Sequence, residues 1–291
     1  MAETLDKLIE LYKDGEITRR EFIGRAVILT GSLVAATSLI EFLLSSPAPA
    51  AQVAPNDPAL ISSDVKFAAP DGATISGYLS RPKGENRRPA VVVVHAWAGI
   101  SDYTRDVARR LATAGYVALA PDLLSRQGGT GSFPSSEAAI ETLRKVDDQV
   151  ITTDLTAAVN YLKGQNFVRP NKIGVIGFCW GGGKALLFTT RNQDLAASVV
   201  YYGANPRNLE DVKRITAPVL GQYGGADERI TTGVPKLEET MKKYGNSFEY
   251  KIYAGAPHAF DDDTSPGSYR EEAAKEAWAR TLEFFDKYLK S

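Results

Sequence analysis

Apolar positions in this chain follow two patterns, short β-branched runs and longer stretches with the period of an amphipathic helix. The runs predict strands at 90–95, 116–120, 173–177, 197–202, 218–223 and 248–253. The longer stretches predict helices at 102–114, 136–146, 148–162, 182–190, 234–244 and 269–290. This alternation predicts an α/β fold, a mostly parallel sheet with helices on both faces. The run at 90–95 is apolar up to its last residue, as expected for a strand buried on both sides.

Two further strand-like runs, at 64–69 and 74–80, precede this alternation and are separated by a Pro-Asp-Gly turn signal. A turn signal between two extended runs predicts an antiparallel hairpin at one edge of the sheet. Residues 51–63 carry two prolines and are interpreted as a linker. One folded domain is therefore predicted over 64–291.

Residues 1–50 have a different character, with paired Arg19 and Arg20 ahead of a mild apolar stretch at 26–44. This order of features resembles a twin-arginine export signal, and an A-x-A-like site predicts cleavage after Ala50. The expected partner of the segment is then the twin-arginine export machinery. The mature protein is expected to be periplasmic or extracellular.

Two other interpretations of this segment stay open, a retained membrane anchor and an ordinary helix. The apolar stretch is just long enough to span a bilayer. Glu41 lies inside it, however, and an acidic residue near a helix centre costs about 2.5–3.5 kcal/mol on insertion scales. Export with cleavage is therefore favoured over a membrane-anchored protein.

The overall composition narrows the range of functions. The chain has 291 residues, of which 24% are charged, with a formal net charge of −1 and no run rich in Lys or Arg. A nucleic-acid partner is therefore not expected. The single cysteine excludes an internal disulfide and any cysteine-rich metal site. We expect no metal, and a monomer or small homo-oligomer.

That cysteine lies in Gly177-Phe178-Cys179-Trp180-Gly181, between a predicted strand and a predicted helix. The pattern is that of a nucleophile elbow, G-x-S-x-G, with Cys in place of Ser. Such a turn is so tight that the neighbours of the nucleophile must be small, and the two glycines meet this need. The following helix N-terminus would favour the thiolate.

An acid and a base follow the cysteine in the chain, each just past a predicted strand. Asp227 lies in a glycine-rich loop, and His258 follows the next strand. The order Cys179, Asp227, His258 is that of the α/β-hydrolase triad. Imidazole suits the task of a general base, and a carboxylate on its other nitrogen fixes the tautomer. Glu228 is the nearest rival for the acid role.

Attack on an ester carbonyl also requires donors for the developing oxyanion. The backbone N–H of Trp180 follows the nucleophile directly, and Trp97 supplies the second by its position after the strand at 90–95. Either tryptophan could instead be a pocket wall or part of the core. His95, the other histidine of the chain, is expected to shape this oxyanion loop.

The run of three aspartates at 261–263 follows His258 closely. Carboxylates at this density can bind a metal ion, but an acidic, solvated turn is the expected interpretation.

Together these residues resemble the dienelactone hydrolase family, the carboxymethylenebutenolidases. The specific matches are the segments 121–123, 175–182, 226–227 and 255–260, and the resemblance covers nearly all of 60–290. It implies an α/β-hydrolase fold with about eight strands, no large lid and no cofactor. It also implies a triad whose roles fall on Cys179, Asp227 and His258.

One position departs from the family pattern, which commonly has a glutamate directly after His or Gln at the end of the third strand. Here the pair is His95-Ala96. We therefore hypothesise that Cys179 pairs directly with His258 and is rich in thiolate at rest. Some members of the family bind the substrate carboxylate through arginines. The expected pocket residues in this chain are His95, Ala96, Arg126 and Phe260, with Arg144 a further nearby candidate.

The main hypothesis is an exported hydrolase of a small ester or lactone that passes through an acyl-thioester on Cys179. A general carboxylesterase or a thioesterase is the nearest alternative. A catalytically idle scaffold with a redox-sensitive cysteine is the alternative from another class.

Overall fold

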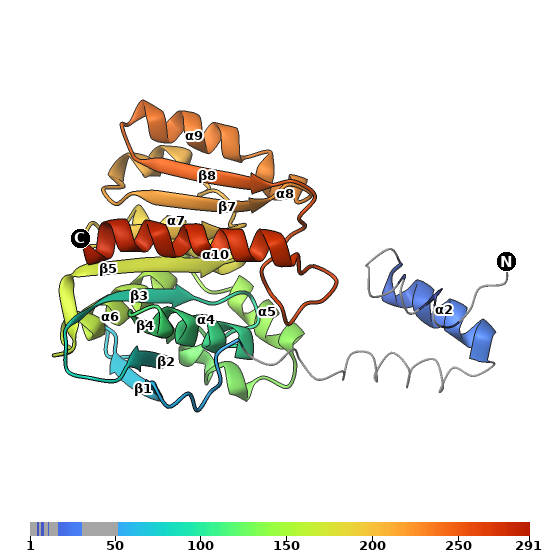
Figure 1. The fold of residues 1–291 in the computed structure, drawn as a ribbon, viewed down its shortest axis with the longest axis horizontal. Coiled ribbons are helices and arrows are strands. Elements are labelled where there is room, and N and C mark those ends of the chain that lie inside the picture. Colours follow the sequence, from blue (N-terminus) through green and yellow to red (C-terminus); the bar gives the residue numbers. More distant parts are fainter. Residues whose placement is uncertain (1–4, 6, 9–10, 12–16, 31–51) are drawn as a thin grey trace.

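The computed structural model describes residues 5, 7–8, 11, 17–30 and 52–291. Eight strands form one sheet in the order β1-β2-β4-β3-β5-β6-β7-β8 (Figure 1). Pairs β1–β2 and β2–β4 are antiparallel and all others are parallel. This confirms the predicted fold class and the edge hairpin. The strands are β1 (Leu60–Ala68), β2 (Thr74–Pro82), β3 (Arg88–Val94), β4 (Val117–Pro121), β5 (Val168–Phe178), β6 (Ala197–Tyr201), β7 (Val219–Gly224) and β8 (Phe248–Tyr253).

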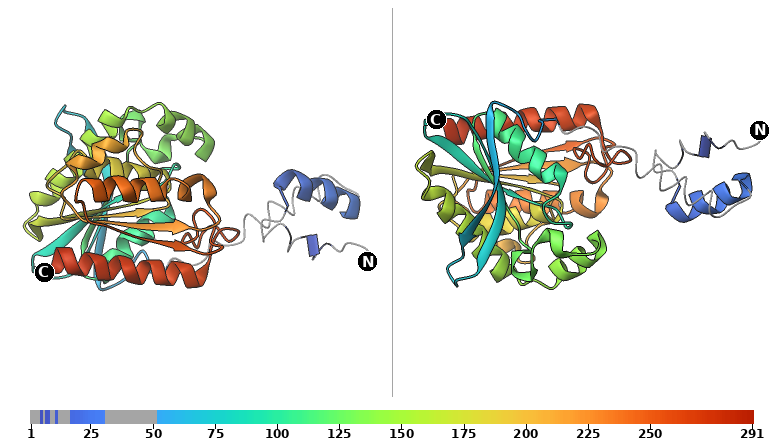
Figure 2. Two further views of the ribbon diagram at one scale, coloured as in Figure 1. Left: turned by 90° about the horizontal axis from the view of Figure 1, so that it is seen from above. Right: turned by 90° about the horizontal axis from the view of Figure 1, so that it is seen from below.

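Helices cover both faces of the sheet (Figure 2). One face carries α4 (Asp102–Thr113) and α10 (Glu271–Phe285), which continues into η4 (Asp286–Lys290). The other face carries α5 (Ser136–Arg144), α6 (Asp148–Lys163), α7 (Trp180–Thr189) and α9 (Val234–Lys243). Short helical turns complete the domain: η1 (Ser125–Gln127), η2 (Thr130–Ser132), η3 (Leu209–Arg214) and α8 (Glu228–Thr231).

Strand β3 shows why the central strands lack alternation. Val91 and Val93 pack under α4 and α10, whereas Val92 and Val94 face α6 and α7. All four side chains are fully buried. Burial of each is worth about 1.5–3 kcal/mol, so the run stabilises both layers of the core.

Several element boundaries differ from the predicted ones. Strand β5 begins at Val168 because Val168 pairs with Arg88 ahead of the apolar run. Helix α4 ends at Thr113, one residue before the predicted end, and its N-cap is Ser101, whose hydroxyl accepts from the Thr104 N–H at 3.2 Å. Helix α7 begins at Trp180, directly after Cys179 and two residues before the predicted start.

The predicted linker is a folded strap over residues 52–59, and β1 begins at Leu60. The Val53 N–H donates to Asp106 Oδ1 at 2.9 Å, and Arg109 Nε donates to the Val53 carbonyl at 2.7 Å. Asp106 and Arg109 are both buried on α4. The backbone of the strap therefore supplies one hydrogen bond to each of two buried charged side chains of the domain.

The N-terminal segment is described only in part. Helix α2 (Arg19–Thr30) begins with a capping box, since the Thr18 N–H donates to Glu21 Oε2 at 2.7 Å and the Glu21 N–H to Thr18 Oγ1 at 3.3 Å. Leu8 packs against Phe22 in a small apolar cluster. No helix in the described part of the chain has the length and apolarity to cross a membrane. Residues 31–51, which include most of the apolar stretch and the cleavage site, lie outside the described residues.

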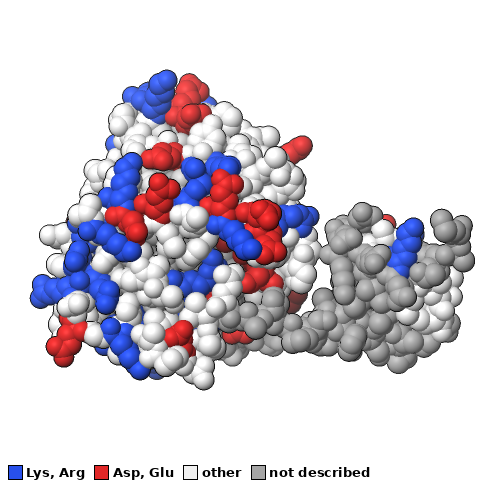
Figure 3. All heavy atoms as spheres, viewed as in Figure 1, with Lys and Arg blue, Asp and Glu red and all other residues white. Residues whose placement is uncertain are grey.

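Charged side chains of both signs are interspersed over the face of the domain that carries α10 (Figure 3). Solvated charges such as these contribute little to stability, whereas loss of one partner of the buried pair Asp106–Arg109 is strongly destabilising.

The strap contacts make Arg109→Met strongly destabilising. Loss of the guanidinium removes the 3.5 Å ion pair with buried Asp106 and the donors to the Val53 carbonyl and the Tyr78 hydroxyl. Arg110 still acts on Asp106, but Asp106 Oδ2 already has no hydrogen-bond partner among the described residues. We expect the free energy of unfolding to fall by about 3–5 kcal/mol in denaturant titrations. The matched control is Arg105→Met on the same helix, where a solvated pair with Asp64 is lost. That change should cost about 1 kcal/mol or less, and equal losses would contradict the assigned role of Arg109.

Candidate active site

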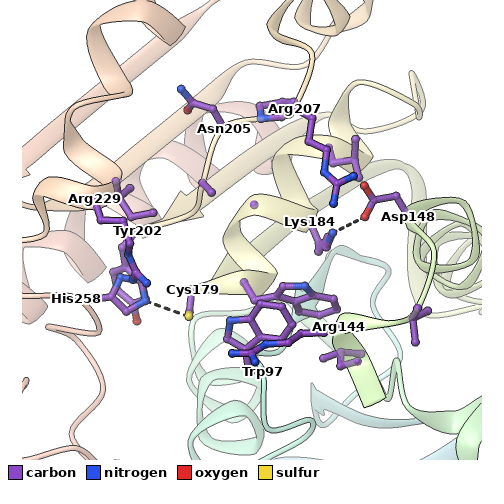
Figure 4. A pocket seen from close by; sticks show the side chains of 18 of the residues that line it. Trp97, Arg144, Asp148, Cys179, Lys184, Tyr202, Asn205, Arg207, Arg229 and His258 are labelled. Atoms are coloured by element: carbon purple, nitrogen blue, oxygen red, sulfur yellow. Dashed lines mark hydrogen bonds and ion pairs between the residues drawn. The ribbon is translucent and has the colours of Figure 1, made fainter. Parts of the chain in front are cut away.

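A pocket of about 660 Å³ lies beyond the carboxyl ends of the parallel strands (Figure 4). Loops that follow β3, β5, β6, β7 and β8 each contribute to its lining, as does the segment 143–148 between α5 and α6. The residues whose side chains carry its chemistry are Trp97, Arg144, Asp148, Cys179, Trp180, Lys184, Tyr202, Arg207, Arg229 and His258. Strand ends therefore gather here, as expected of an open α/β sheet.

Cys179 occupies a sharp turn between β5 and α7. Its backbone has φ 56° and ψ −122°, a conformation that costs a non-glycine residue about 1–3 kcal/mol. A Cβ on Gly177 would lie 2.1 Å from the Gly181 carbonyl oxygen, and one on Gly181 would lie 2.3 Å from the His95 carbonyl oxygen. Both positions therefore require glycine.

The turn aims Cys179 at His258. Cys179 Sγ lies 3.0 Å from His258 Nε2, and His258 Nδ1 lies 2.5 Å from Asp227 Oδ2. Asp227 is buried and acts only as an acceptor, so Nδ1–H donates to it and Nε2 accepts from the thiol. The three side chains that sequence order predicted as a group are thus brought together in one chain of hydrogen bonds.

The environment of the thiol disfavours the thiolate at rest. Burial raises the pKa of Cys179, while the Trp180 N–H and the Arg229 guanidinium act in the opposite direction and the Asp227 carboxylate adds to the rise. Burial is the largest of these effects and favours the thiol, so the direction of the shift runs against the hypothesis of a thiolate-rich resting cysteine.

The other candidate acid, Glu228, and the other histidine, His95, form no hydrogen bond with Cys179. Glu228 is exposed on α8 and does not line the pocket. His95 is fully buried, and its Nε2 accepts the Leu123 N–H at 3.1 Å, so Nδ1–H donates to the Ala96 carbonyl at 2.6 Å. Burial lowers the pKa of His95, which keeps it neutral. It thus holds the loop after β3 against the segment after β4.

The predicted oxyanion residues lie in the expected loops. Trp97 and Trp180 both line the pocket, with ring centroids 5.3 Å apart. The Trp180 N–H points at the sulfur and lowers the thiol pKa, as noted above. The two indoles also form an aromatic wall beside the nucleophile, so the two interpretations of these residues do not exclude each other.

Most of the predicted pocket residues are not part of the lining. Arg126 is the clearest correction, because it forms ion pairs with Asp154 at 2.7 Å and Asp71 at 2.8 Å, away from Cys179. Phe260 is fully buried among Tyr201, Tyr202 and Tyr253, and neither His95 nor Ala96 lines the pocket.

The interpretation of the acidic run as a solvated turn is wrong for Asp261. Its side chain is buried and accepts hydrogen bonds from the hydroxyls of Tyr103, at 2.5 Å, and Tyr202. Asp262 instead caps its own turn by accepting from Thr264. Among the described residues, no group of three or more His, Cys, Asp or Glu side chains is placed to hold a metal ion.

Several pocket residues were not found from the sequence. Arg207 follows β6 and Arg229 follows β7. Their positions after the carboxyl ends of strands, the same signal that located Asp227, could have identified them. Tyr202 directly follows β6, and its ring centroid is 4.8 Å from that of His258. Lys184 forms an ion pair with Asp148 across the pocket floor, a contact between distant elements that no local pattern indicates.

Comparison with known proteins gives consistent matches. A model of the dienelactone hydrolase family matches residues 75–289. The "Putative carboxymethylenebutenolidase" of Methylorubrum extorquens is 36% identical over 274 residues, covering 89% of this chain and 94% of that protein. The "Probable 2-oxo-3-(5-oxofuran-2-ylidene)propanoate lactonase" of a Bradyrhizobium species is 36% identical over 227 residues, covering 73% and 89%. The solved "Putative Dienelactone Hydrolase" of Klebsiella pneumoniae superposes with a TM-score of 0.73 at 30% identity, covering 79% of this chain and 100% of that one.

Proposed function

Since the chain belongs to the dienelactone hydrolase family, a family of carboxylic ester hydrolases, we propose that it cleaves a small ester or lactone with Cys179 as nucleophile. The observation that carries this proposal is the continuous hydrogen-bonded chain from Cys179 Sγ through His258 to Asp227, at 3.0 and 2.5 Å. Cys179, at one end of this hydrogen-bonded series, lines the pocket, so its sulfur can reach the carbonyl carbon of a bound substrate.

Acylation follows from the resting geometry. Sγ bonds to the carbonyl carbon while its proton passes to His258 Nε2, and Asp227 stabilises the imidazolium that forms. The carbonyl oxygen becomes an oxyanion that accepts from the backbone N–H groups of Trp180 and Trp97. When the tetrahedral intermediate collapses, the carbon–oxygen bond of the ester breaks and the leaving oxygen takes the proton from Nε2. The product is an acyl-thioester on Cys179.

Deacylation uses the same groups in reverse. His258 removes a proton from water, and the resulting nucleophile attacks the thioester carbonyl. The second oxyanion uses the same N–H donors. Collapse breaks the carbon–sulfur bond, releases the carboxylic acid and returns the proton to Cys179. In a lactone the alcohol and the acid remain in one molecule, so ring opening yields a hydroxy acid.

Positive charge in the pocket favours an anionic substrate. Arg144, Arg207 and Arg229 line the pocket, and Figure 4 shows Arg207 across it from Cys179. Lys184 is paired with Asp148 and Arg229 lies 3.9 Å from Asp227, whereas Arg144 and Arg207 have no ion pair within the described part of the chain. The Bradyrhizobium relative is named for a lactone that carries a carboxylate, a substrate of this charge and size. We therefore propose a carboxylate-bearing lactone or ester, oriented by an arginine through a charge-assisted hydrogen bond.

We further propose that residues 1–50 are a twin-arginine export signal, that the export machinery is their partner and that the mature protein is periplasmic or extracellular. Support comes from the paired arginines ahead of an apolar stretch that ends in an A-x-A-like site. The contacts of Val53 with Asp106 and Arg109 lie after the proposed cleavage site, so cleavage after Ala50 would keep them.

The nucleophile assignment predicts that Cys179→Ala lowers the rate of p-nitrophenyl acetate hydrolysis by about 10⁴-fold or more, and that Asp227→Asn lowers it by a comparable order. The matched control is Glu228→Gln, the neighbouring carboxylate, which should keep the wild-type rate. Equal rates for wild type and Cys179→Ala would contradict hydrolysis through this residue and favour the idle scaffold.

The charge preference predicts that Arg207→Gln raises KM about tenfold for p-nitrophenyl hydrogen succinate, because a hydrogen bond to a charged group is lost. KM for neutral p-nitrophenyl acetate should change little. Arg191→Gln, which removes an arginine that does not line the pocket, serves as control. A parallel rise in both KM values would count against carboxylate recognition by Arg207.

The export proposal predicts that a variant with Arg19→Lys and Arg20→Lys stays inside the cell, whereas Arg25→Lys is exported like the wild type. Cell fractionation measures the distribution, and N-terminal sequencing of exported protein should begin at Ala51. Unchanged export of the double variant would sink the assignment.

A further inference from the structure

Unusual backbone conformations cluster around the catalytic histidine. In the part of the chain that the structure describes, three non-glycine residues have a left-handed φ: Cys179 at 56°, Tyr202 at 37° and Ala259 at 60°. The conformation of Cys179 belongs to the elbow. Tyr202 and Ala259 both lie against His258, one by ring contact and one as its chain neighbour. Strain of this kind persists only where the surroundings fix the residue, so something must hold Tyr202 and the histidine loop.

Tyr202 forms one wall of the imidazole of His258. The two ring centroids are 4.8 Å apart at an interplanar angle of 60°, and the tyrosine is almost fully buried. The His258 side chain is 26% exposed to solvent, because the other side of its imidazole borders the pocket. Figure 4 shows the Tyr202 ring next to the imidazole that points at Cys179.

Asp261 holds that wall in place. Its carboxylate accepts from the hydroxyl of Tyr202 and, at 2.5 Å, from the hydroxyl of Tyr103 on α4. Asp261 follows His258 on the same loop, and between them Phe260 is buried against Tyr202 with ring centroids 5.7 Å apart. The loop that carries the histidine therefore also carries the acceptor that fixes the ring beside it.

The protonation states fit this arrangement. Burial raises the pKa of Asp261 to about 6, and the hydrogen bonds from both tyrosines and the Arg110 charge oppose the rise, whereas the Asp262 charge adds to it. Burial likewise raises the pKa of both tyrosines well above the usual value, so their hydroxyls remain donors. At neutral pH the Asp261 carboxylate thus accepts hydrogen bonds from two buried tyrosine hydroxyls.

We propose that Asp261 is a positioning residue for the reaction: it fixes the Tyr202 hydroxyl, and the Tyr202 ring then holds His258 in the orientation that joins Cys179 to Asp227. The inference rests on the proposed function for its catalytic consequence. Its structural part, the fixing of one imidazole by one buried carboxylate, stands on the contacts alone.

The first test compares kcat and KM in three variants. Tyr202→Phe removes the hydroxyl but keeps the ring, and Asp261→Asn keeps the shape but cannot accept from both tyrosines. Both should lower kcat about ten- to a hundredfold with KM nearly unchanged, because small misplacement of a catalytic base has this effect. The matched control is Tyr103→Phe, which removes the other hydroxyl from the same carboxylate but does not touch His258. It should keep kcat within about twofold of the wild type, a loss well below the rate effects of misplaced groups.

The second test reads the imidazole directly and does not depend on hydrolysis. The chain has only two histidines, so ¹⁵N-histidine labelling gives one Nδ1–H resonance from His258 and one from His95. The His258 proton, bonded to Asp227, should exchange faster with water or shift in Tyr202→Phe and Asp261→Asn. The His95 proton, bonded to the Ala96 carbonyl, should stay as in the wild type and report an intact fold.

The results separate this inference from the proposed function. Unchanged kcat and an unchanged His258 resonance in Tyr202→Phe would overturn the positioning role, as would an equal loss of kcat in Tyr103→Phe. If the wild type shows no hydrolysis that depends on Cys179, the proposed function fails while the resonance test still decides the positioning role. If Asp261→Asn does not fold, Tyr202→Phe carries both measurements.

Discussion

The close approach of three backbone segments at the turn between β5 and α7 is the constraint on which the site depends. Gly177, Gly181 and the carbonyl of His95 lie so near one another that a single methyl group would overlap them. This packing forces Cys179 into its left-handed conformation and places its sulfur above the sheet. It also puts the Trp180 N–H, in the first turn of α7, beside the Cys179 sulfur, where the proposed reaction requires an oxyanion donor. The proposed nucleophile and one of its proposed oxyanion donors are thus placed by the same packing.

The parts of the molecule that follow from local pattern were predictable from the sequence. The uninterrupted run at 90–94 identified a strand buried on both faces, and the position of a polar residue just past a predicted strand identified Asp227 and His258. These inferences succeed because the carboxyl ends of parallel strands meet at one edge of the sheet whatever the intervening helices do. The Gly-x-Cys-x-Gly spacing located Cys179 in a similar way, because the tight turn has no room for a Cβ at either glycine and this requirement is visible in the sequence.

The parts that failed depend on contacts between distant segments. Arg126 follows the carboxyl end of β4, which suggested a place in the pocket, but ion pairs with Asp71 and with Asp154 on α6 hold it elsewhere. Asp261 sits in an acidic run that looks solvated, yet tyrosines from α4 and from the end of β6 bury it. The segment at 52–59 has the composition of a linker and is held through its backbone, which carries no sequence signal. The raised pKa of Cys179 likewise follows from burial, which outweighs the helix N-terminus that sequence reasoning considered.

In the proposed function, Cys179 rests as a thiol and becomes a nucleophile only as His258 accepts its proton, in a site where position 96 is an alanine. Trapping the acyl-enzyme tests this central claim most directly. Wild-type protein is mixed with excess p-nitrophenyl acetate, quenched in acid within the first turnover and digested for mass spectrometry. The account predicts one acetyl group per chain, on the peptide that contains Cys179 and removable by hydroxylamine as a thioester. An unmodified Cys179 peptide during active turnover, or acetyl groups on serine or lysine instead, would contradict it.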